Sequence, residues 1–365
     1  MTGQATRSLL VAAMLLAGCA SPSVTATPSM VAASEAEPSS VATPMPSVAP
    51  TLPAWRELTP SGETPAARED HTWTITPDFV TAYLFGGRTG EGAALGDLWA
   101  YDLPGNSWAL VTEDGPPARF GHNAAWVDGV GLVIFAGQAG ATFYNDLWTF
   151  NPAANAWEEL PADGAVPVPR YGSCAAIGPD GRLWISHGFT QEGQRFADTR
   201  AYDFSTSTWT DETPAGEAPI QRCLHACWWT DDGAFALYAG QTTGTNSLDD
   251  LWWLAVGERP GTNAWAEQVP DGPPPARNLY AAARWGSMTL VVGGQALDGS
   301  ALDDTWLLSD DGSSAPTLIG GTRPPARWAA ELIADPSHGR LLLFGGRDAD
   351  GARDDLWELT GPPDE

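Results

Sequence analysis

The sequence predicts an all-β fold, a six-bladed β-propeller formed by residues 53–365. Three observations lead to this prediction. A sequence unit recurs six times at intervals of 50 to 55 residues, each unit has the pattern of four short strands, and glycine, proline and tryptophan are abundant, with 40, 31 and 18 residues. Helices are not expected after Leu16, because no useful stretch there repeats its apolar residues every 3.6 positions. Hydrophobic residues make up 43% of the 365 residues, which is enough for a sizeable core.

The first 18 residues have the pattern of an export signal. Arg7 precedes an apolar run from Leu9 to Leu16, which is too short to span a bilayer comfortably. The run ends in Leu-Ala-Gly-Cys, which resembles the box of bacterial lipoproteins, where the cysteine is lipidated and becomes the mature N-terminus. The alternative is an ordinary signal peptide followed by an unrelated cysteine. We expect residues 1–18 to be a lipoprotein signal peptide and Cys19 to carry the lipid.

Residues 19–52 are predicted to form a disordered tether. They are rich in serine, threonine, proline and alanine, and their only charged residues are Glu35 and Glu37. Such a segment cannot bury enough apolar surface to offset the entropy of ordering. The protein is therefore expected to be anchored to a bacterial membrane and to face the periplasm or the cell exterior.

The charge balance limits the partners. The formal net charge is −27, and the chain contains no lysine. Such a chain is repelled by nucleic acid and by anionic lipid headgroups. We expect no nucleic-acid partner, membrane contact through the N-terminal lipid only, and a monomer.

Each repeat unit carries the same landmarks in the same order. An arginine opens the unit, an apolar run ending in glycine follows, an aspartate then starts a second run that usually contains tryptophan, and a further tryptophan follows a turn. The arginines are Arg68, Arg119, Arg170, Arg222, Arg277 and Arg327. The aspartates are Asp97, Asp146, Asp198, Asp250, Asp304 and Asp355.

These landmarks divide each unit into four predicted strands, called a to d. Strand a follows the arginine, strand b is the apolar run, strand c starts at the aspartate, and strand d carries the last tryptophan. Strands a and b are separated by Asp128-Gly129, Asp180-Gly181 and Asp232-Gly233 in three units. Aspartate-glycine suits a tight hairpin turn, whose central residues need positive φ. Four antiparallel strands in every unit are typical of a propeller blade.

The sixth unit contains strands a, b and c but lacks strand d. The segment "PAWREL" at residues 53–58 is similar to the d strand "NAWEEL" at residues 155–160. An open ring of blades would leave strand edges and apolar faces exposed. We therefore expect the strand around Trp55 to complete the last blade and to close the ring.

The glycine pairs, the Asp-Leu-Trp runs and the Asn-x-Trp turns recur at matching offsets and resemble the Kelch repeat, in the form called galactose-oxidase central-domain-like. The resemblance covers six units, from about Ala54 to the end of the sequence. It implies a propeller that binds its partners on the face formed by the d–a and b–c loops. Nothing matches the copper ligands of galactose oxidase, so no cofactor is expected.

Nine residues are predicted to form the ligand-binding face. Six directly follow the strand b glycines and three directly follow the repeat arginines. The nine residues are Arg88, Gln138, Phe189, Gln241, Gln295, Arg347, Phe120, Tyr171 and Trp328. The arginines and glutamines can grip a carbohydrate or a peptide carboxylate. Alternatively, each of these groups bonds only to its own b–c loop.

Other candidate residues have competing explanations. His71, His122 and His225 occupy one repeat position and can either hold a metal or bond a neighbouring blade, and the latter is preferred. Asp348 and Asp350 lie around a glycine and suggest a cation loop, but the pattern of an EF-hand is missing. In the third unit, His187, Phe189 and Arg200 depart from the repeat, through either function or drift.

The three remaining cysteines are expected on neighbouring blades. Cys223 and Cys227 are four residues apart along one strand, which is too far for a disulfide between them. Cys174 can form a disulfide with either of them, or all three can be buried thiols.

The favoured function is non-catalytic binding of a protein or a glycan, with no catalytic residues and no metal assigned. The alternative is a sugar-acting enzyme that uses the central channel. The sialic acid mutarotase among exported Kelch proteins illustrates it, because such a reaction needs only an acid–base pair. Glu69 and Asp70, beside His71, can supply that pair.

Overall fold

The computed structural model describes residues 53–361, except residues 260, 270–271, 311–313 and 317–321. The described residues belong to one compact unit, Pro50–Glu365. The predicted signal peptide, Cys19 and the tether lie outside the described residues. The helices in the described part are three short 3₁₀ turns, η1 (Gln191–Gly193), η2 (Thr243–Thr245) and η3 (Pro336–His338). None of the helices among the described residues has the length and apolarity needed to cross a membrane.

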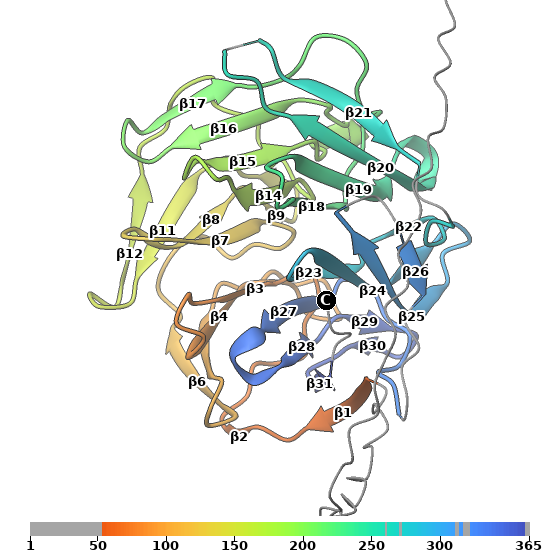
Figure 1. Cartoon of the computed structure of the whole chain (residues 1–365). Coiled ribbons are helices and arrows are strands. Elements are labelled where there is room, and N and C mark those ends of the chain that lie inside the picture. The colour runs from red at the N-terminus through yellow and green to blue at the C-terminus, as the bar shows by residue number, and fades with distance from the viewer. Residues whose placement is uncertain (1–52, 260, 270–271, 311–313, 317–321, 362–365) are drawn as a thin grey trace, which may run out of the picture. The chain divides into compact units, whose positions relative to one another are not determined.

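Six four-stranded antiparallel units follow one another along the chain and form the blades seen in Figure 1. Blade 1 contains β3 (Thr72–Ile75), β4 (Thr81–Phe85), β5 (Leu98–Asp102) and β6 (Ser107–Thr112). Blade 2 contains β7 (Asn123–Val127), β8 (Gly131–Phe135), β11 (Leu147–Asn151) and β12 (Ala156–Leu160). Blade 3 contains β14 (Cys174–Ile177), β15 (Leu183–Ser186), β16 (Thr199–Asp203) and β17 (Thr208–Asp211).

The second half of the chain repeats the arrangement. Blade 4 contains β18 (Ala226–Trp229), β19 (Phe235–Gln241), β20 (Ser247–Ala255) and β21 (Ala264–Gln268). Blade 5 contains β23 (Ala281–Trp285), β24 (Met288–Ala296), β25 (Ala301–Ser309) and β26 (Ser314–Pro316). Blade 6 contains β27 (Glu331–Asp335), β28 (Arg340–Phe344), β31 (Leu356–Thr360) and β1 (Ala54–Leu58). The first strands of neighbouring blades contact one another, so these six strands are innermost.

Short strands extend this framework. β2 (Ser61–Gly62) pairs in parallel with β6, and β13 (Asp163–Gly164) pairs in parallel with β17. Two b–c loops form small hairpins, β9 (Gln138–Ala139) with β10 (Thr142–Phe143), and β29 (Arg347–Asp348) with β30 (Gly351–Ala352). β22 (Arg277–Asn278) pairs with both β20 and β24 and therefore joins blades 4 and 5.

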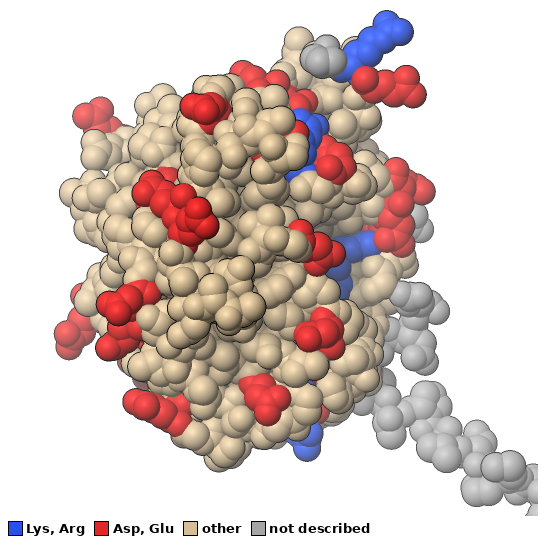
Figure 2. Space-filling model, turned by 90° about the vertical axis from the view of Figure 1, so that its left-hand side faces the viewer, with Lys and Arg blue, Asp and Glu red and all other residues tan. Residues whose placement is uncertain are grey.

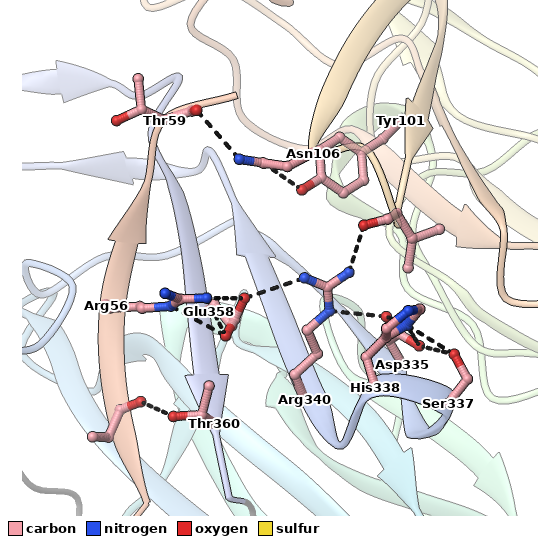
Figure 3. A network of polar contacts seen from close by, with 12 residues as sticks. Arg56, Thr59, Tyr101, Asn106, Asp335, Ser337, His338, Arg340, Glu358 and Thr360 are labelled. Atoms are coloured by element: carbon pink, nitrogen blue, oxygen red, sulfur yellow. Dashed lines mark hydrogen bonds and ion pairs between the residues drawn. The ribbon is translucent and has the colours of Figure 1, made fainter. Parts of the chain in front are cut away.

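The strand around Trp55 supplies the fourth strand of blade 6, as the sequence predicts. β1 pairs antiparallel with β31, with Trp55 opposite Leu359. Figure 3 shows the polar network behind this pairing. Arg56 Nη2 lies 3.0 Å from Glu358 Oε1, and the same carboxylate accepts a hydrogen bond from Arg340 Nη1 at 3.2 Å. Arg340 Nη2 donates to the carbonyl of Leu103 in blade 1 at 2.7 Å, so the network also reaches the neighbouring blade.

The hydrophobic core consists of six clusters, and each lies between two neighbouring blades. The cluster between blades 6 and 1 packs Phe344 and Leu342 against Trp73 and Trp108. Tryptophans recur in these clusters because each indole buries a large apolar area between the sheets. The ring of blades is therefore continuous between the last and the first blade.

A buried ion pair fixes the loops in every blade. The six repeat arginines are almost fully buried, and each makes two parallel hydrogen bonds to the repeat aspartate of its own blade. In blade 2, Arg119 lies 2.6 and 2.8 Å from the oxygens of Asp146 and also donates to the carbonyl of Ala136 at 2.9 Å. Burial opposes ionisation of Asp146, but the hydrogen bonds and charge of Arg119 hold its pKa below the ordinary value. We call these six pairs the clamps.

Candidate ligand-binding face and central channel

A closed circle of backbone hydrogen bonds surrounds one end of the channel. It is formed by the residues two positions after the clamp arginines, which we call the mouth ring: Asp70, Gly121, Gly172, Leu224, Leu279 and Ala329. Each donates its N–H to the carbonyl of the ring residue in the preceding blade, over 2.7 to 3.2 Å. All six have positive φ, between 53 and 62°. The ring brings the d–a loops of all six blades to one face.

The residues next to the mouth ring form the predicted ligand-binding face. Each residue that directly follows a clamp arginine makes a backbone bridge to the residue after the strand b glycines. The pairs are Glu69–Arg88, Phe120–Gln138, Tyr171–Phe189, Cys223–Gln241, Asn278–Gln295 and Trp328–Arg347. All nine predicted face residues belong to these six pairs, so the structure brings them together. Their role in ligand binding stays a prediction.

Four aromatic side chains form a continuous row on this face, which we call the aromatic row. Phe143, Phe189, Tyr171 and Phe120 follow one another edge to face, with centroid distances of 5.8, 4.9 and 5.7 Å. The guanidinium of Arg88 lies 4.8 Å from the centre of the Phe120 ring. Gly121 makes this packing possible, because a Cβ at that position would lie 1.9 Å from the Tyr171 ring.

The planar polar groups of the face already have intramolecular partners. Gln138 and Gln295 donate to the carbonyls of Gly140 and Gly299 in their own b–c loops, at 2.7 and 3.3 Å. Gln241 accepts a hydrogen bond from Arg195 of the neighbouring blade at 3.0 Å. The bonds of Gln138 and Gln295 agree with the alternative that such groups bond to their own loops, whereas the bond of Gln241 joins two blades. A ligand would have to share or replace them.

Glu69 and Asp70 form a polar cluster with two face arginines. Arg88 lies 3.2 Å from Glu69 and 2.9 Å from Asp70, and Arg347 lies 3.1 Å from Glu69. The Tyr171 hydroxyl donates to Asp70 at 3.1 Å. Burial raises the pKa of Asp70 to about 6, although the charge of Arg88 opposes this shift. Because Glu69 is held by two arginines, it is a poor partner for Asp70 in acid–base chemistry.

Two cavities that share wall residues lie in the channel below the mouth ring. The inner cavity measures about 310 Å³, and its lining includes Asp70, His71, Tyr280 and Glu331. The second measures about 890 Å³ and opens on the face of the a–b turns. Trp73, Trp126, Trp285, Phe79 and Arg284 line it, and we call it the tryptophan mouth. Both cavities share Trp73, Thr74, Ala124, Ala282 and Leu332 in their walls.

Glu331 is the second acid of the inner cavity. It is the first residue of β27 and keeps partial exposure inside the channel. Burial, followed by the negative charge of Asp70, raises its pKa to about 8. The inner cavity therefore holds two carboxyl groups that take up and release protons close to neutral pH.

The raised pKa of Glu331 predicts how the stability of the fold depends on pH. The folded protein binds the Glu331 proton more tightly than the unfolded chain does, so this residue destabilises the fold as the pH rises from about 4.5 to 8. Glu331→Gln removes the effect. We expect its melting temperature to match the unmodified protein at pH 4.5 and to exceed it at pH 8.5 by on the order of 5–10 °C. Calorimetry at both pH values tests this, and an equal offset at both would contradict it.

The three repeat histidines are packed between blades. The rings of His71, His122 and His225 lie 5.2 to 5.6 Å from a ring of the preceding blade, namely Phe344, Phe85 and His187. Thr72 Oγ1 in blade 1 also lies 2.8 Å from His122 Nε2. Burial, assisted by the charge of Arg68, lowers the pKa of His71 to about 3. Among residues 53–361, outside the stated gaps, no group of three or more histidine, cysteine or acidic side chains is placed to hold a metal.

The departures in blade 3 have structural explanations. Arg200 Nε donates to Asp198 at 3.1 Å, as the Trp148 indole donates to Asp146 at 2.8 Å in blade 2. His187 takes the backbone conformation of the glycine that it replaces, with a φ of 59°. Of the three departures, only Phe189 lies on the loop face.

One of the two possible disulfides is present. Cys174 on β14 is bonded to Cys227 on β18, which joins blades 3 and 4. Cys223 is a buried free thiol and precedes β18. Burial raises its pKa to about 11, which disfavours the reactive thiolate.

The acidic loop near the end of the chain already contains a cation. The guanidinium of Arg353 contacts the carboxylate of Asp348 and lies 3.0 Å from Asp350. This internal ion pair replaces the cation that the sequence pattern suggested. The hairpin β29–β30 is therefore a scaffold element.

Comparison with known proteins identifies the family. The model of the KLHDC2/KLHL20/DRC7 Kelch-repeats domain matches residues 49–240 and 161–314, which together exceed half of the chain. The chain belongs to the Kelch-repeat family. A solved structure entitled "Structure of YjhT" superposes with a TM-score of 0.63 and 19% identity, covering 80% of this chain and 95% of that chain. At this identity the likeness shows the fold alone.

Curated relatives share the Kelch region. Acyl-CoA-binding domain-containing protein 5 of Arabidopsis thaliana is 33% identical over 179 residues, 47% of this chain and 28% of that protein. The Rab9 effector protein with kelch motifs of Xenopus laevis is 26% identical over 215 residues, 56% of this chain and 58% of that protein. Adagio-like protein 3 of Oryza sativa subsp. japonica is 24% identical over 334 residues, which are 86% of this chain and 52% of that protein. The chain thus spans less than two thirds of each of these relatives. Kelch propellers generally bind protein partners.

Sequence reasoning missed two residues of this Kelch propeller. Arg195 reaches the face from the b–c loop of blade 3, and its guanidinium lies 6.0 Å from the centre of the Phe189 ring. Its loop contains no repeat landmark that could have marked it. Glu331 occupies the fourth position after a clamp arginine, where the other blades carry Thr72, Asn123, Cys174, Ala226 and Ala281. The only sequence signal was a single acid at a position that is otherwise uncharged.

Proposed function

We propose that this protein is an exported, lipid-anchored Kelch propeller that binds a protein or a glycan on its loop face. The pattern at Cys19 supports the lipid anchor, and residues 19–52 would hold the propeller away from a bacterial membrane, toward the periplasm or the cell exterior. Mass spectrometry of membrane-associated protein tests the anchor. A mature N-terminus at any residue other than a lipidated Cys19 would refute this part of the proposal.

The aromatic row carries the proposal for the loop face. Phe143, Phe189, Tyr171 and Phe120 form a row, with Arg195 beside Phe189 and Arg88 beside Phe120 at one end. Aromatic and arginine side chains contribute most of the binding energy at many protein interfaces. Phe143 and Phe189, the two partly exposed rings of the row, offer faces for sugar rings, and the adjacent arginines and glutamines can orient hydroxyl or carboxylate groups.

Phe189 is the most suitable residue for a test. It is partly exposed and contacts both Tyr171 and Phe143. We expect Phe189→Ala to weaken ligand binding at least tenfold, because truncation of a central aromatic side chain costs roughly 1.4 kcal/mol or more. A glycan array and a pull-down with the full chain identify the ligand, and titration then measures the affinity.

Val80→Ala is the control, since Val80 is exposed in the a–b turn of blade 1 on the opposite face. It should leave the affinity unchanged. An equal loss of ligand affinity in both variants would argue against the loop face as the binding site. If the glycan and protein screens found no ligand and the protein catalysed the exchange of sugar anomers, the binding function would be refuted and an enzymatic function would be supported.

A sugar mutarotase in the channel is the second candidate function. Asp70 and Glu331 line one cavity and have pKa values of about 6 and 8, so one can accept a proton while the other donates one. Exchange spectroscopy on the anomers of reducing sugars tests this candidate. The mutarotase candidate requires that the unmodified protein catalyses exchange between the anomers and that the Glu331→Gln variant does not.

A further inference from the structure

The channel has two chemically different ends. The inner cavity is lined by polar groups, which include Asp70 and Glu331. The tryptophan mouth is lined mainly by apolar side chains, and it adjoins the inner cavity, because the two cavities share five wall residues. Ligand sites typically occupy roughly 300–1,000 Å³ and combine apolar walls with a few polar groups. The channel therefore has the size and composition of a site for a small molecule with one polar end.

The charges along the channel favour a cationic polar end. Asp70 has a cationic partner in Arg88. The charged side chain that acts on Glu331 is Asp70, which has the same sign. Arg284 in the tryptophan mouth lies 2.5 Å from Asp310 and 3.0 Å from Asp231, so its charge is already compensated.

The remaining titratable groups do not add positive charge to the inner cavity. Burial lowers the pKa of His71, His122 and His225, which leaves them neutral at pH 7. Tyr280 also lines the cavity, and burial raises its pKa far above the ordinary value, so it stays neutral as well. The outer surface supports the same preference, since the face in Figure 2 shows scattered acidic side chains and few basic ones. A net charge of −27 attracts cations.

We propose that the channel binds an organic ammonium ligand with an apolar body, whose ammonium group contacts Glu331 and whose body lies in the tryptophan mouth. An ammonium group donates hydrogen bonds to a carboxylate and compensates its charge. The faces of Trp126 and Trp285 attract cations and cover apolar groups. This inference concerns the channel and does not depend on the function proposed for the loop face.

Binding of an ammonium ligand should also release the proton of Glu331. At pH 7 the free protein holds a proton on Glu331 in a large fraction of molecules, and a bound ammonium ion favours the ionised carboxylate. Uptake of the amine should therefore be accompanied by release of protons to the buffer. Calorimetry in two buffers with different heats of ionisation measures the number of protons released.

The experiment titrates the full chain with 2-phenylethylamine, with 2-phenylethanol as the uncharged counterpart. We expect the amine to bind at least tenfold more tightly than the alcohol and to release protons at pH 7. Glu331→Gln should weaken the amine at least tenfold and abolish proton release. Trp126→Ala should weaken both compounds, because it removes part of the apolar wall.

Glu57→Gln is the matched control, since Glu57 is exposed on β1. It should leave amine binding unchanged. The variant Glu331→Gln is expected to fold, because the amide replaces a carboxyl group that is mostly protonated at pH 7. Equal affinity for amine and alcohol, or full amine affinity in Glu331→Gln, would overturn the proposal. Binding of a free sugar without binding of the amine would assign the channel to the sugar-acting alternative.

Discussion

Arg119→Ala should destabilise the propeller by about 3–5 kcal/mol, the cost of breaking a buried ion pair by removing one partner. Arg119 is fully buried, and its guanidinium donates to both oxygens of Asp146. Its loss leaves a desolvated carboxylate and removes the donors to the carbonyls of Ala136 and Pro117. Urea unfolding followed by tryptophan fluorescence gives the change in the free energy of unfolding.

Two further variants make this test specific. Arg259→Ala removes an exposed arginine and should change the free energy of unfolding by less than about 0.5 kcal/mol. Arg119→Met combined with Asp146→Leu removes both charges and should recover part of the loss, because no unpaired charge remains. The clamp interpretation would fail if Arg119→Ala cost no more than Arg259→Ala.

Removal of the disulfide should cost about 4 kcal/mol, the value that chain-entropy estimates give for a bond between cysteines 53 residues apart. The bond joins the innermost strands of blades 3 and 4, and it closes a loop that restricts the conformations of the unfolded chain. The double variant Cys174→Ala with Cys227→Ala removes it without leaving a new thiol. Thermal or urea unfolding of the oxidised proteins compares their stabilities.

Reduction provides an independent measurement of the same quantity. A reductant should lower the stability of the unmodified protein to that of the double variant, and it should not affect the double variant. Cys223→Ala is the control and should cost only about 1 kcal/mol, because it removes one small buried group. Equal stability of the oxidised and reduced proteins would contradict the prediction.

The fold was predictable because its landmarks recur. Six arginine and aspartate positions located the blades, and the likeness of "PAWREL" to the d strands located the strand around Trp55. The direct pairing of these arginines and aspartates was not predicted, although their constant order in every unit could have suggested it. The aspartate-glycine turns were located correctly, and Gly129 has the positive φ, 77°, that such a turn needs.

The candidate sites were only partly predictable. The nine face residues follow repeat landmarks, so their neighbourhood could be inferred from the order of the strands. The mouth ring was hidden, because Leu224, Leu279 and Ala329 are not residues that normally indicate positive φ. Of the two channel acids, Asp70 was a sequence candidate for an acid–base pair, whereas Glu331 was hidden, because its burial and its position relative to Asp70 depend on how blades 6 and 1 meet.

The pairing of β1 with β31 separates the order of synthesis from the order of assembly. Arg56 leaves the ribosome early, whereas its partner Glu358 follows 302 residues later. At translation rates of about 5–20 residues per second, β1 remains without its partner for on the order of 15–60 s. Blades 1 to 5 can form during this delay, but blade 6 cannot. Nascent chains stalled before Glu358 should therefore expose the edge of β1 to chaperones and proteases.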